Sequence, residues 1–363
     1  MMQHKEVLKR AWNNVVSYRA LWIFGIILAL TTGSGGGGGN GSTFYNLSED
    51  EVRGRGTRLD LKPGDNFFEE FGKTFEYEMG EANQELELFF RDVLETDIEI
   101  DLATILITML WIMVGLIIIT TMLRYTSETS LIRMVDGREE SGEKMSIGAG
   151  FRLGWSRSAW RLFLIDLTFG VPLAAIFLSL FAVAFAMMLR WAFVGNNDAT
   201  FLTMIAVGLF FLTILMAILV GVVLGLLKPF FRRASALDDL GVFASIRQGY
   251  RVVRHNLKDA GLMWLIMIGI GLGWAILMVP LVLLLLVSGM VIGGVSGLMV
   301  GGLAGTLGGV IAGAIIFLIV LIAPLSFLEG LREVFFSSTW TITYRELRAL
   351  GSLEAVEVVE VEA

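Results

Sequence analysis

The residues best suited to chemistry are four cations, Arg247, Arg251, Arg254 and Lys258, in the stretch 242–266. Their steps of three or four residues place them on one face of a helix. An apolar stripe follows the same steps through Val242, Ile246, Tyr250, Val253 and Leu257. Cations beside such a stripe bind anionic lipid headgroups while the apolar residues enter the acyl boundary. The same pattern also sets membrane topology and anchors a helix without recognising a particular lipid.

A related pattern occurs twice earlier in the chain. Three segments share the order apolar, basic, any, small, aromatic: Leu8-Lys9-Arg10-Ala11-Trp12, Phe151-Arg152-Leu153-Gly154-Trp155 and Ile246-Arg247-Gln248-Gly249-Tyr250. Each lies at the cytoplasmic entrance of a predicted odd-numbered span, although the apolar run after the first segment is short, and such recurrence is typical of a repeated structural unit. Chance recurrence of five loosely defined positions is the alternative. We therefore add Lys9 and Arg152 to the candidate headgroup-binding residues.

Other chemistry is poorly represented. The chain has no cysteine and two histidines, and it carries no nucleophile elbow, zinc motif or paired-carboxylate signature. We therefore predict a protein that is not an enzyme, with no metal, no cofactor and no nucleic-acid partner. Asp166 is the one acid well inside an apolar run, and intramembrane acids are functional candidates. Because it follows Arg161 by five residues, we expect an arginine-paired acid near the interface rather than a proton relay.

The composition indicates how these residues are positioned. The chain is 55% hydrophobic and 17% charged, whereas a soluble domain carries about a quarter charged residues. Several apolar runs exceed the roughly 20 residues that cross a bilayer as a helix. We predict an all-α polytopic membrane bundle, in which six transmembrane helices form three pseudo-repeated hairpins, each preceded by an amphipathic interfacial helix. The expected spans are a helix from about Trp12 to Leu30, and Leu102–Leu123, Leu162–Leu189, Phe201–Leu227, Ala260–Val287 and Gly294–Leu325.

Four regions follow from this pattern. Residues 1–32 hold an amphipathic helix and the first span, and residues 33–101 hold a glycine linker and an acidic helical insertion. Residues 102–330 hold spans two to six with two basic loops, and residues 331–363 hold an amphipathic helix and an acidic tail. Residues 33–101 have 17 acidic and 6 basic residues, a net charge of −11. The net charge of the whole chain is −7, so the rest of the chain is at +4. The acids of the insertion lack the spacing of a dedicated calcium loop, so we expect a solvated helix face.

Basic residues predict the orientation. Seven lysines and arginines lie in 124–161 and seven in 228–258, and both of these loops fall on the same side as the termini. Short loops rich in Lys and Arg stay cytoplasmic. We predict a bacterial inner-membrane protein with both termini in the cytoplasm and residues 33–101 outside.

A run of glycines every fourth residue is the most regular motif. It comprises Gly293, Gly297, Gly301, Gly305, Gly309 and Gly313. On one helix these residues would form a seam that another backbone can approach closely. The seam could join copies of the chain, or it could pack against glycines of another span in the same chain.

The segment Gly241–Arg254, GVFASIRQGYRVVR, and the closing segment Phe336–Leu347, FSSTWTITYREL, resemble the membrane domain of bacterial glycerophosphodiester phosphodiesterases. The resemblance covers the membrane body, and the catalytic barrel of fused relatives is absent. It therefore implies a membrane fold and brings no activity. The glycine linker and the acidic insertion depart from that family's pattern.

Two functions remain open from the sequence. The first is a non-catalytic scaffold or accessory subunit of a membrane assembly or homo-oligomer, supported by the glycine seam and the amphipathic C-terminal helix. The second is a lipid or small-molecule transporter or lipid-binding protein, supported by the repeat, by the surface cations and by prolines inside two spans, since broken helices in repeats mark transport sites. The expected partners are anionic lipids and either further copies or other membrane subunits.

Overall fold

A computed structural model describes residues 2–32, 102–194 and 197–362, and every regular element in these ranges is a helix. Five helices are long and apolar enough to cross a membrane, or six if the bent pair at the N-terminus counts as one span. The chain is therefore an all-α, multi-pass membrane protein. The predicted glycine linker and the acidic insertion at 33–101 lie outside the described residues.

The chain divides into two compact units, residues 1–42 with 122–363, and residues 43–121. The second is described only over the apolar first half of α4, which runs from Leu102 to Ser141. All contacts reported below belong to the first unit.

The N-terminal region forms two helices, and the second begins at Ala20 and not near Trp12, where the first span was predicted to begin. α1 spans His4–Ser17 and α2 spans Ala20–Thr32, with a bend of 97° between them. The buried side chain of Tyr18 fixes the bend, because its hydroxyl donates to the Met145 carbonyl at 3.0 Å and accepts from the Met145 amide at 2.6 Å. The sequence pattern missed this bend because it depends on a contact 127 residues away.

The long helices continue past the predicted ends of the spans. α4 runs to Ser141 and α7 (Asn197–Leu237) runs to Leu237, although loops were predicted from Arg124 and Phe230. At 1.5 Å per residue a 40-residue helix is about 60 Å long, twice the hydrocarbon thickness. The charged segments stay helical because their apolar residues keep the helical step and are buried. These residues are Leu131, Met134, Val135, Phe230 and Ala234.

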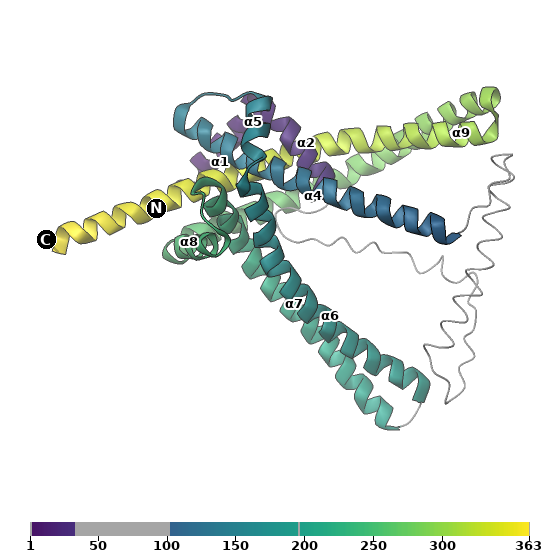
Figure 1. Ribbon diagram of the computed structural model, residues 1–363, viewed down its shortest axis with the longest axis horizontal. Helices are drawn as coiled ribbons and strands as arrows, with labels where there is room; N and C mark the ends of the chain where they lie inside the picture. The colour runs from purple at the N-terminus through teal and green to yellow at the C-terminus, as the bar shows by residue number, and fades with distance from the viewer. Residues whose placement is uncertain (1, 33–101, 195–196, 363) are drawn as a thin grey trace. The chain divides into compact units, whose positions relative to one another are not determined.

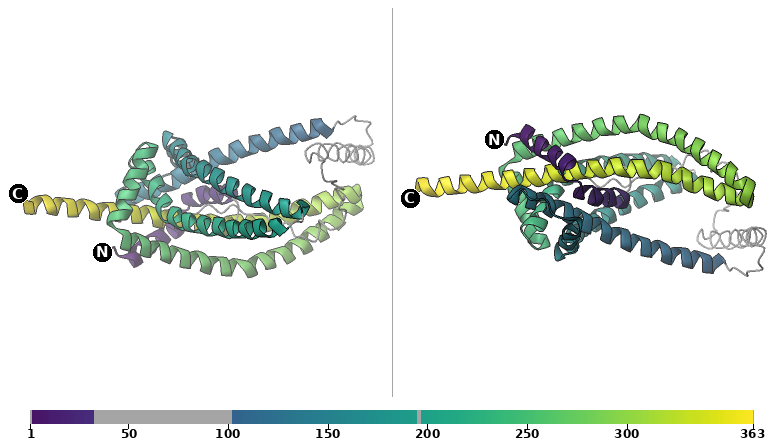
Figure 2. Two further views of the ribbon diagram at one scale, coloured as in Figure 1. Left: turned by 90° about the horizontal axis from the view of Figure 1, so that it is seen from below. Right: turned by 90° about the horizontal axis from the view of Figure 1, so that it is seen from above.

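α9 (Leu257–Glu362) consists of two helical halves that meet at Gly305. Gly305 has φ +81°, a conformation that glycine adopts without steric cost. The chain therefore reverses at Gly305, not before Gly294 as predicted, and the two halves run side by side (Figure 2). The C-terminal segment predicted as a separate helix from Glu333 continues the second half without a break.

The ends of the long helices assemble with three short helices: α1, α5 (Ile147–Gly154) and α8 (Val242–His255) (Figure 1). We call this assembly the hub. The main core cluster lies here, and its fully buried members include Leu21, Phe24, Met134, Met263 and Tyr344. α6 (Arg157–Val194) and α7 pack side by side as they leave the hub, and so do the halves of α9.

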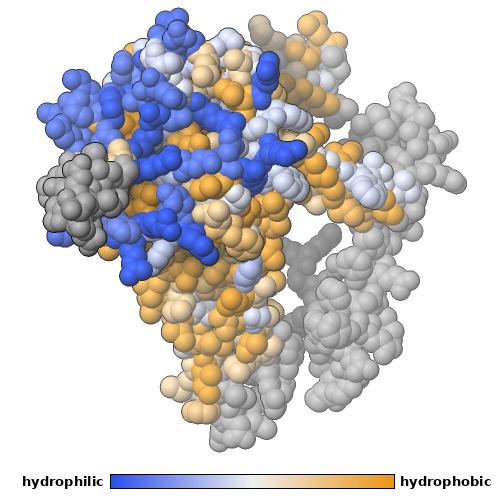
Figure 3. All heavy atoms as spheres, turned by 60° about the vertical axis from the view of Figure 1, so that its left-hand side comes forward, coloured by the Kyte–Doolittle hydropathy of each residue, from blue (hydrophilic) through white to orange (hydrophobic). Residues whose placement is uncertain are grey.

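Burial differs sharply between the hub and the apolar stretches that leave it. At most 11% of the most apolar stretch of any candidate span is buried in the chain. Hydrophilic residues gather over the hub, whereas hydrophobic residues follow the α6–α7 pair (Figure 3). Apolar surface of this extent is stable when lipid covers it, which agrees with a membrane location.

Candidate functional site

Three of the four predicted cations lie on the exposed face of α8, which ends at His255, whereas Lys258 is the second residue of α9 and not part of the same helix as predicted. Arg247, Arg251, Arg254 and Lys258 are exposed, while the buried side of α8 consists of small and branched residues. Buried on that side are Ser245, Gly249, Val252 and Val253. Arg247, Arg251 and Arg254 border a shallow hollow of about 380 Å³. These cations are available to a ligand at the surface of the hub.

The aromatic and apolar neighbours of these cations differ from the predicted stripe. Tyr250 is 50% exposed and Leu257 is 58% exposed, and Phe243, which the stripe left out, is 80% exposed. The helix packs through Gly249, because a Cβ there would lie 2.9 Å from the backbone nitrogen of Phe231. The buried side of α8 is therefore the side where glycine allows a close approach, and the exposed side combines three arginines with aromatic rings. We call residues 243, 247, 250, 251 and 254, together with Lys258 at the start of α9, the α8 face.

The corresponding positions of the three similar segments have the same environment. The small residue is buried in each, the basic residue is exposed in each, and the aromatic residue is at least half exposed in each. The small residues are Ala11, Gly154 and Gly249, the basic residues are Lys9, Arg152 and Arg247, and the aromatic residues are Trp12, Trp155 and Tyr250. Lys9, Arg152 and Arg247 lie on three different short helices, α1, α5 and α8. Each short helix therefore presents its own basic residue.

Asp166 lies at the centre of a buried ionic cluster. Its carboxylate accepts from the Arg232 guanidinium at 2.5 Å and from the Tyr125 hydroxyl at 2.8 Å, and the Lys228 ammonium lies 3.0 Å away. Arg232 also donates to Glu128 at 2.8 Å. All four charged side chains are at most 13% exposed. One guanidinium therefore joins α4, α6 and α7 by bridging two carboxylates.

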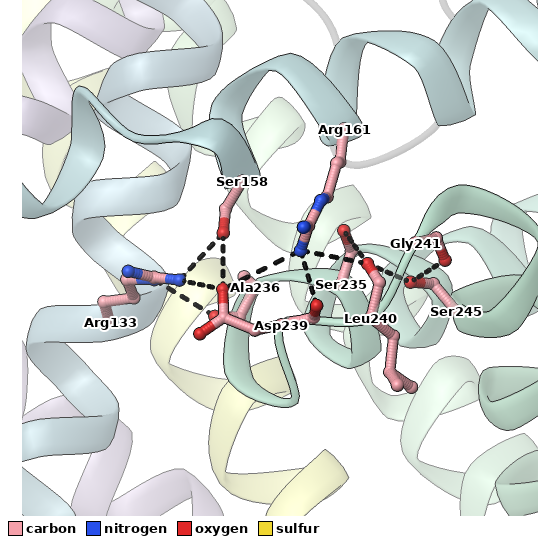
Figure 4. A network of polar contacts seen from close by, with 9 residues as sticks. All are labelled: Arg133, Ser158, Arg161, Ser235, Ala236, Asp239, Leu240, Gly241 and Ser245. Carbon is pink, nitrogen blue, oxygen red and sulfur yellow. Dashed lines mark hydrogen bonds and ion pairs between the residues drawn. The ribbon is translucent and has the colours of Figure 1, made fainter.

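Arg161, the nearest arginine to Asp166 in sequence, belongs to a different network (Figure 4). It donates to the carbonyl of Asp239 at 2.5 Å. The Asp239 carboxylate accepts from Arg133 at 2.6 Å and from the Ser158 hydroxyl at 3.1 Å. Asp239 has φ +49°, so the short turn between α7 and α8 is held in an uncommon conformation by α4 and α6.

An apolar groove of about 700 Å³ lies beside the ionic cluster, between α6, α7 and α9. Small residues, including Gly170, Gly221 and Gly225, form part of its lining. Among the described residues that line the groove, Lys228 is the one with a charge, and Trp264 and Trp340 line it as well. The groove thus combines an apolar wall with three hydrogen-bond donors.

The glycine run packs within the chain, and its members do not share one helix as predicted. Gly293, Gly297 and Gly301 precede the reversal at Gly305, whereas Gly309 and Gly313 follow it. A Cβ at Gly293 would lie 2.7 Å from the Gly313 carbonyl oxygen, and one at Gly297 would lie 2.8 Å from the Gly309 oxygen. The run therefore brings the two halves of α9 together, and within the described residues its closest contacts are to the other half of α9 and not to another span.

Sequence reasoning missed Lys228, Arg232 and Glu128 as members of the Asp166 cluster. Lys228 was read as the end of a span and the other two as loop residues. A usable signal was present, because Lys228 and Arg232 are four residues apart and continue the helical step of α7. Arg232 is 104 residues from Glu128 and 66 residues from Asp166 in the sequence, so no local pattern predicts either ion pair.

One comparison with known proteins gives a match. The model of a family of unknown function (DUF7544) matches residues 15–353. No curated protein and no solved structure matches the chain.

Proposed function

For a chain that belongs to DUF7544, a family of unknown function, we propose the role of a non-catalytic integral membrane protein that binds anionic lipids through its short surface helices. The observation that carries this proposal is the α8 face, where three exposed arginines lie on the same helix as exposed Phe243 and Tyr250 and exposed Lys258 follows at the start of α9. Aromatic rings favour the headgroup level of a bilayer, and arginines there attract anionic lipid.

The geometry favours lipid binding over the scaffold role. Two features that would have supported a protein partner are used inside the chain: the glycine run packs on itself, and the apolar side of the C-terminal segment lies in the hub. Phe336, Trp340, Tyr344 and Leu347 are at most 9% exposed. The external acidic insertion, which could contact a partner, lies outside the described residues.

We extend the proposal to α1 and α5 through the repeat. The shared burial of the small residue and the shared exposure of the basic and aromatic residues support three related units, each with a short helix at the membrane surface. Lys9 and Arg152 would then contact lipid as Arg247 does. The relation to the membrane domain of glycerophosphodiester phosphodiesterases stays a prediction and brings no activity.

Replacing Arg247, Arg251 and Arg254 together by glutamine should weaken the preference for anionic lipid by up to about 100-fold. Each surface cation contributes about 1 kcal/mol near an anionic bilayer, so three give roughly 3 kcal/mol. The measurement is the enrichment of phosphatidylglycerol over phosphatidylcholine around the purified protein, determined by lipid mass spectrometry.

The matched control replaces the same three arginines by lysine, which keeps the charge. That variant should keep the preference, and raising the salt concentration should weaken it in the wild type because these charges are exposed. An unchanged preference in the glutamine variant would contradict the proposed function.

We also propose that the hub faces the cytoplasm of a bacterial inner membrane, with both termini on that side. Because the chain has no cysteine, a single cysteine can report its side. Glu143→Cys lies in the exposed link between α4 and α5, and Gly302→Cys lies next to the reversal at Gly305. In right-side-out vesicles an impermeant maleimide should label only Gly302→Cys. If only Glu143→Cys is labelled, the orientation is the opposite of the one proposed.

A further inference from the structure

We propose that the groove between α6, α7 and α9 holds one phospholipid molecule, with an acyl chain along the apolar wall and the phosphate at Lys228, Trp264 and Trp340. This site is separate from the α8 face, goes beyond the proposed surface binding and does not depend on it. It would select for the phosphate that phospholipids share and not for net negative charge.

The size and lining of the groove suit an acyl chain. Small-molecule sites have volumes of roughly 300–1,000 Å³, and this groove has about 700 Å³. Its wall includes Leu173, Phe177, Ile218 and Met267, and these residues belong to candidate membrane spans. An apolar groove within the membrane-spanning part of a protein is open to lipid, and its apolar wall forms no hydrogen bonds with water.

The glycines of the groove differ from the glycines that pack helices together. A Cβ added at Gly170 or Gly221 would have no heavy atom within 4 Å. By contrast, a Cβ at Gly249 would collide with the backbone of Phe231, and one at Gly330 would lie 2.8 Å from the Ile26 nitrogen. Gly170 and Gly221 therefore do not bring helices into contact; they widen the space that an occupant can fill.

Hydrogen-bond donors at the groove favour a phosphate. The Lys228 ammonium lies 3.0 Å from Asp166, whose other oxygen is held by Arg232 and Tyr125, so the lysine is fixed in position. Within the described residues the indole N–H groups of Trp264 and Trp340 have no acceptor, and no carboxylate lines the groove. A phosphate supplies acceptors for the two indoles, beside the ammonium that Asp166 already holds.

A second copy of the chain fits this groove less well. The candidate spans that such a copy would insert are apolar, so they would cover the wall and leave the two indole N–H groups without acceptors. Phospholipid is present wherever the protein resides in the membrane, and it satisfies both parts of the site. We therefore assign the groove to phospholipid.

The experiment fills the groove with one side chain. Gly221→Leu places a leucine into the open space, and the matched control Gly208→Leu adds the same side chain to the same helix outside the groove, also with no atom within 4 Å. Each protein is purified in mild detergent with dioleoyl phosphatidylcholine and measured by native mass spectrometry. We expect one retained phospholipid per chain in the wild type and in Gly208→Leu, and at least a tenfold loss in Gly221→Leu.

Three results would overturn the proposal: no retained phospholipid in the wild type, equal retention in the two leucine variants, or dissociation of an oligomer in Gly221→Leu without loss of lipid. Phosphatidylcholine is zwitterionic, so this readout does not depend on the arginines of the α8 face. The triple glutamine variant should therefore keep the single retained lipid even if it loses its anionic preference.

A second variant tests the phosphate. Lys228→Met combined with Asp166→Asn removes the ammonium and its partner carboxylate together, so the neutral pair leaves neither charge buried alone. The wild type should retain phosphatidylcholine at least tenfold better than dioleoylglycerol, which has no phosphate. The double variant should retain both equally. If the wild type retains phosphatidylcholine and dioleoylglycerol equally, the assignment of the phosphate to Lys228 is overturned.

Discussion

Replacing Arg232 by leucine should lower the free energy of unfolding by about 3–5 kcal/mol, the range observed when one partner of a buried ion pair is removed. Arg232 donates to Glu128 and Asp166, and all three side chains are at most 13% exposed. The variant leaves Glu128 without its cation and Asp166 with Lys228 alone. The hub should therefore loosen where α4, α6 and α7 meet.

The measurement is thermal unfolding in detergent micelles, followed by loss of helical circular dichroism. Arg157→Leu is the matched control, because Arg157 is exposed at the start of α6 and has no ion pair among the described residues. Exposed substitutions of this kind change stability by about 0.5 kcal/mol or less. Equal melting temperatures for the two variants would show that the cluster does not hold the hub together.

Replacing Gly297 by leucine should destabilise the contact between the two halves of α9 by about 1–3 kcal/mol, the usual cost of overpacking. A Cβ at this position would lie 2.8 Å from the Gly309 carbonyl oxygen and 3.3 Å from the Gly313 Cα. Both are backbone atoms, so they move away only if the helices separate. Resistance to proteolysis near the reversal and the melting temperature should both fall.

Gly302→Leu provides the control on the same helical half. A Cβ there has no heavy atom within 4 Å, so the leucine would meet no other part of the described chain. The melting temperature of Gly302→Leu should match the wild type. If Gly297→Leu is as stable as Gly302→Leu, the glycine run does not join the halves of α9.

Local patterns in the sequence were sufficient for the class of protein and for the exposed arginines of α8. Long apolar runs predict membrane helices because the hydrocarbon core excludes unpaired backbone groups. The steps of the α8 cations predict one face because helical geometry fixes the neighbours at three and four residues. Both features depend only on residues close together in the chain.

The details of packing needed the tertiary structure. The pattern of α8 put Tyr250 and Leu257 with the apolar stripe, but the helix docks on α7 through Gly249, where the absent side chain admits the backbone of Phe231. The regular spacing of the glycines suggested one helix, yet the reversal at Gly305 folds the run on itself. A glycine can allow two helices to approach closely, or it can allow the chain to turn. The neighbouring residues in the sequence do not show which of these two roles it has.

The sequence by itself determined that this is a helical membrane protein with basic, aromatic short helices and an acid inside a span. Only the tertiary structure decided that Asp166 pairs with Arg232 and Lys228 and that a groove with Lys228 and two indoles lies beside them. The physical reason is distance along the chain. Periodicity reports which face of one helix is apolar, whereas an ion pair or a groove depends on how separate helices meet.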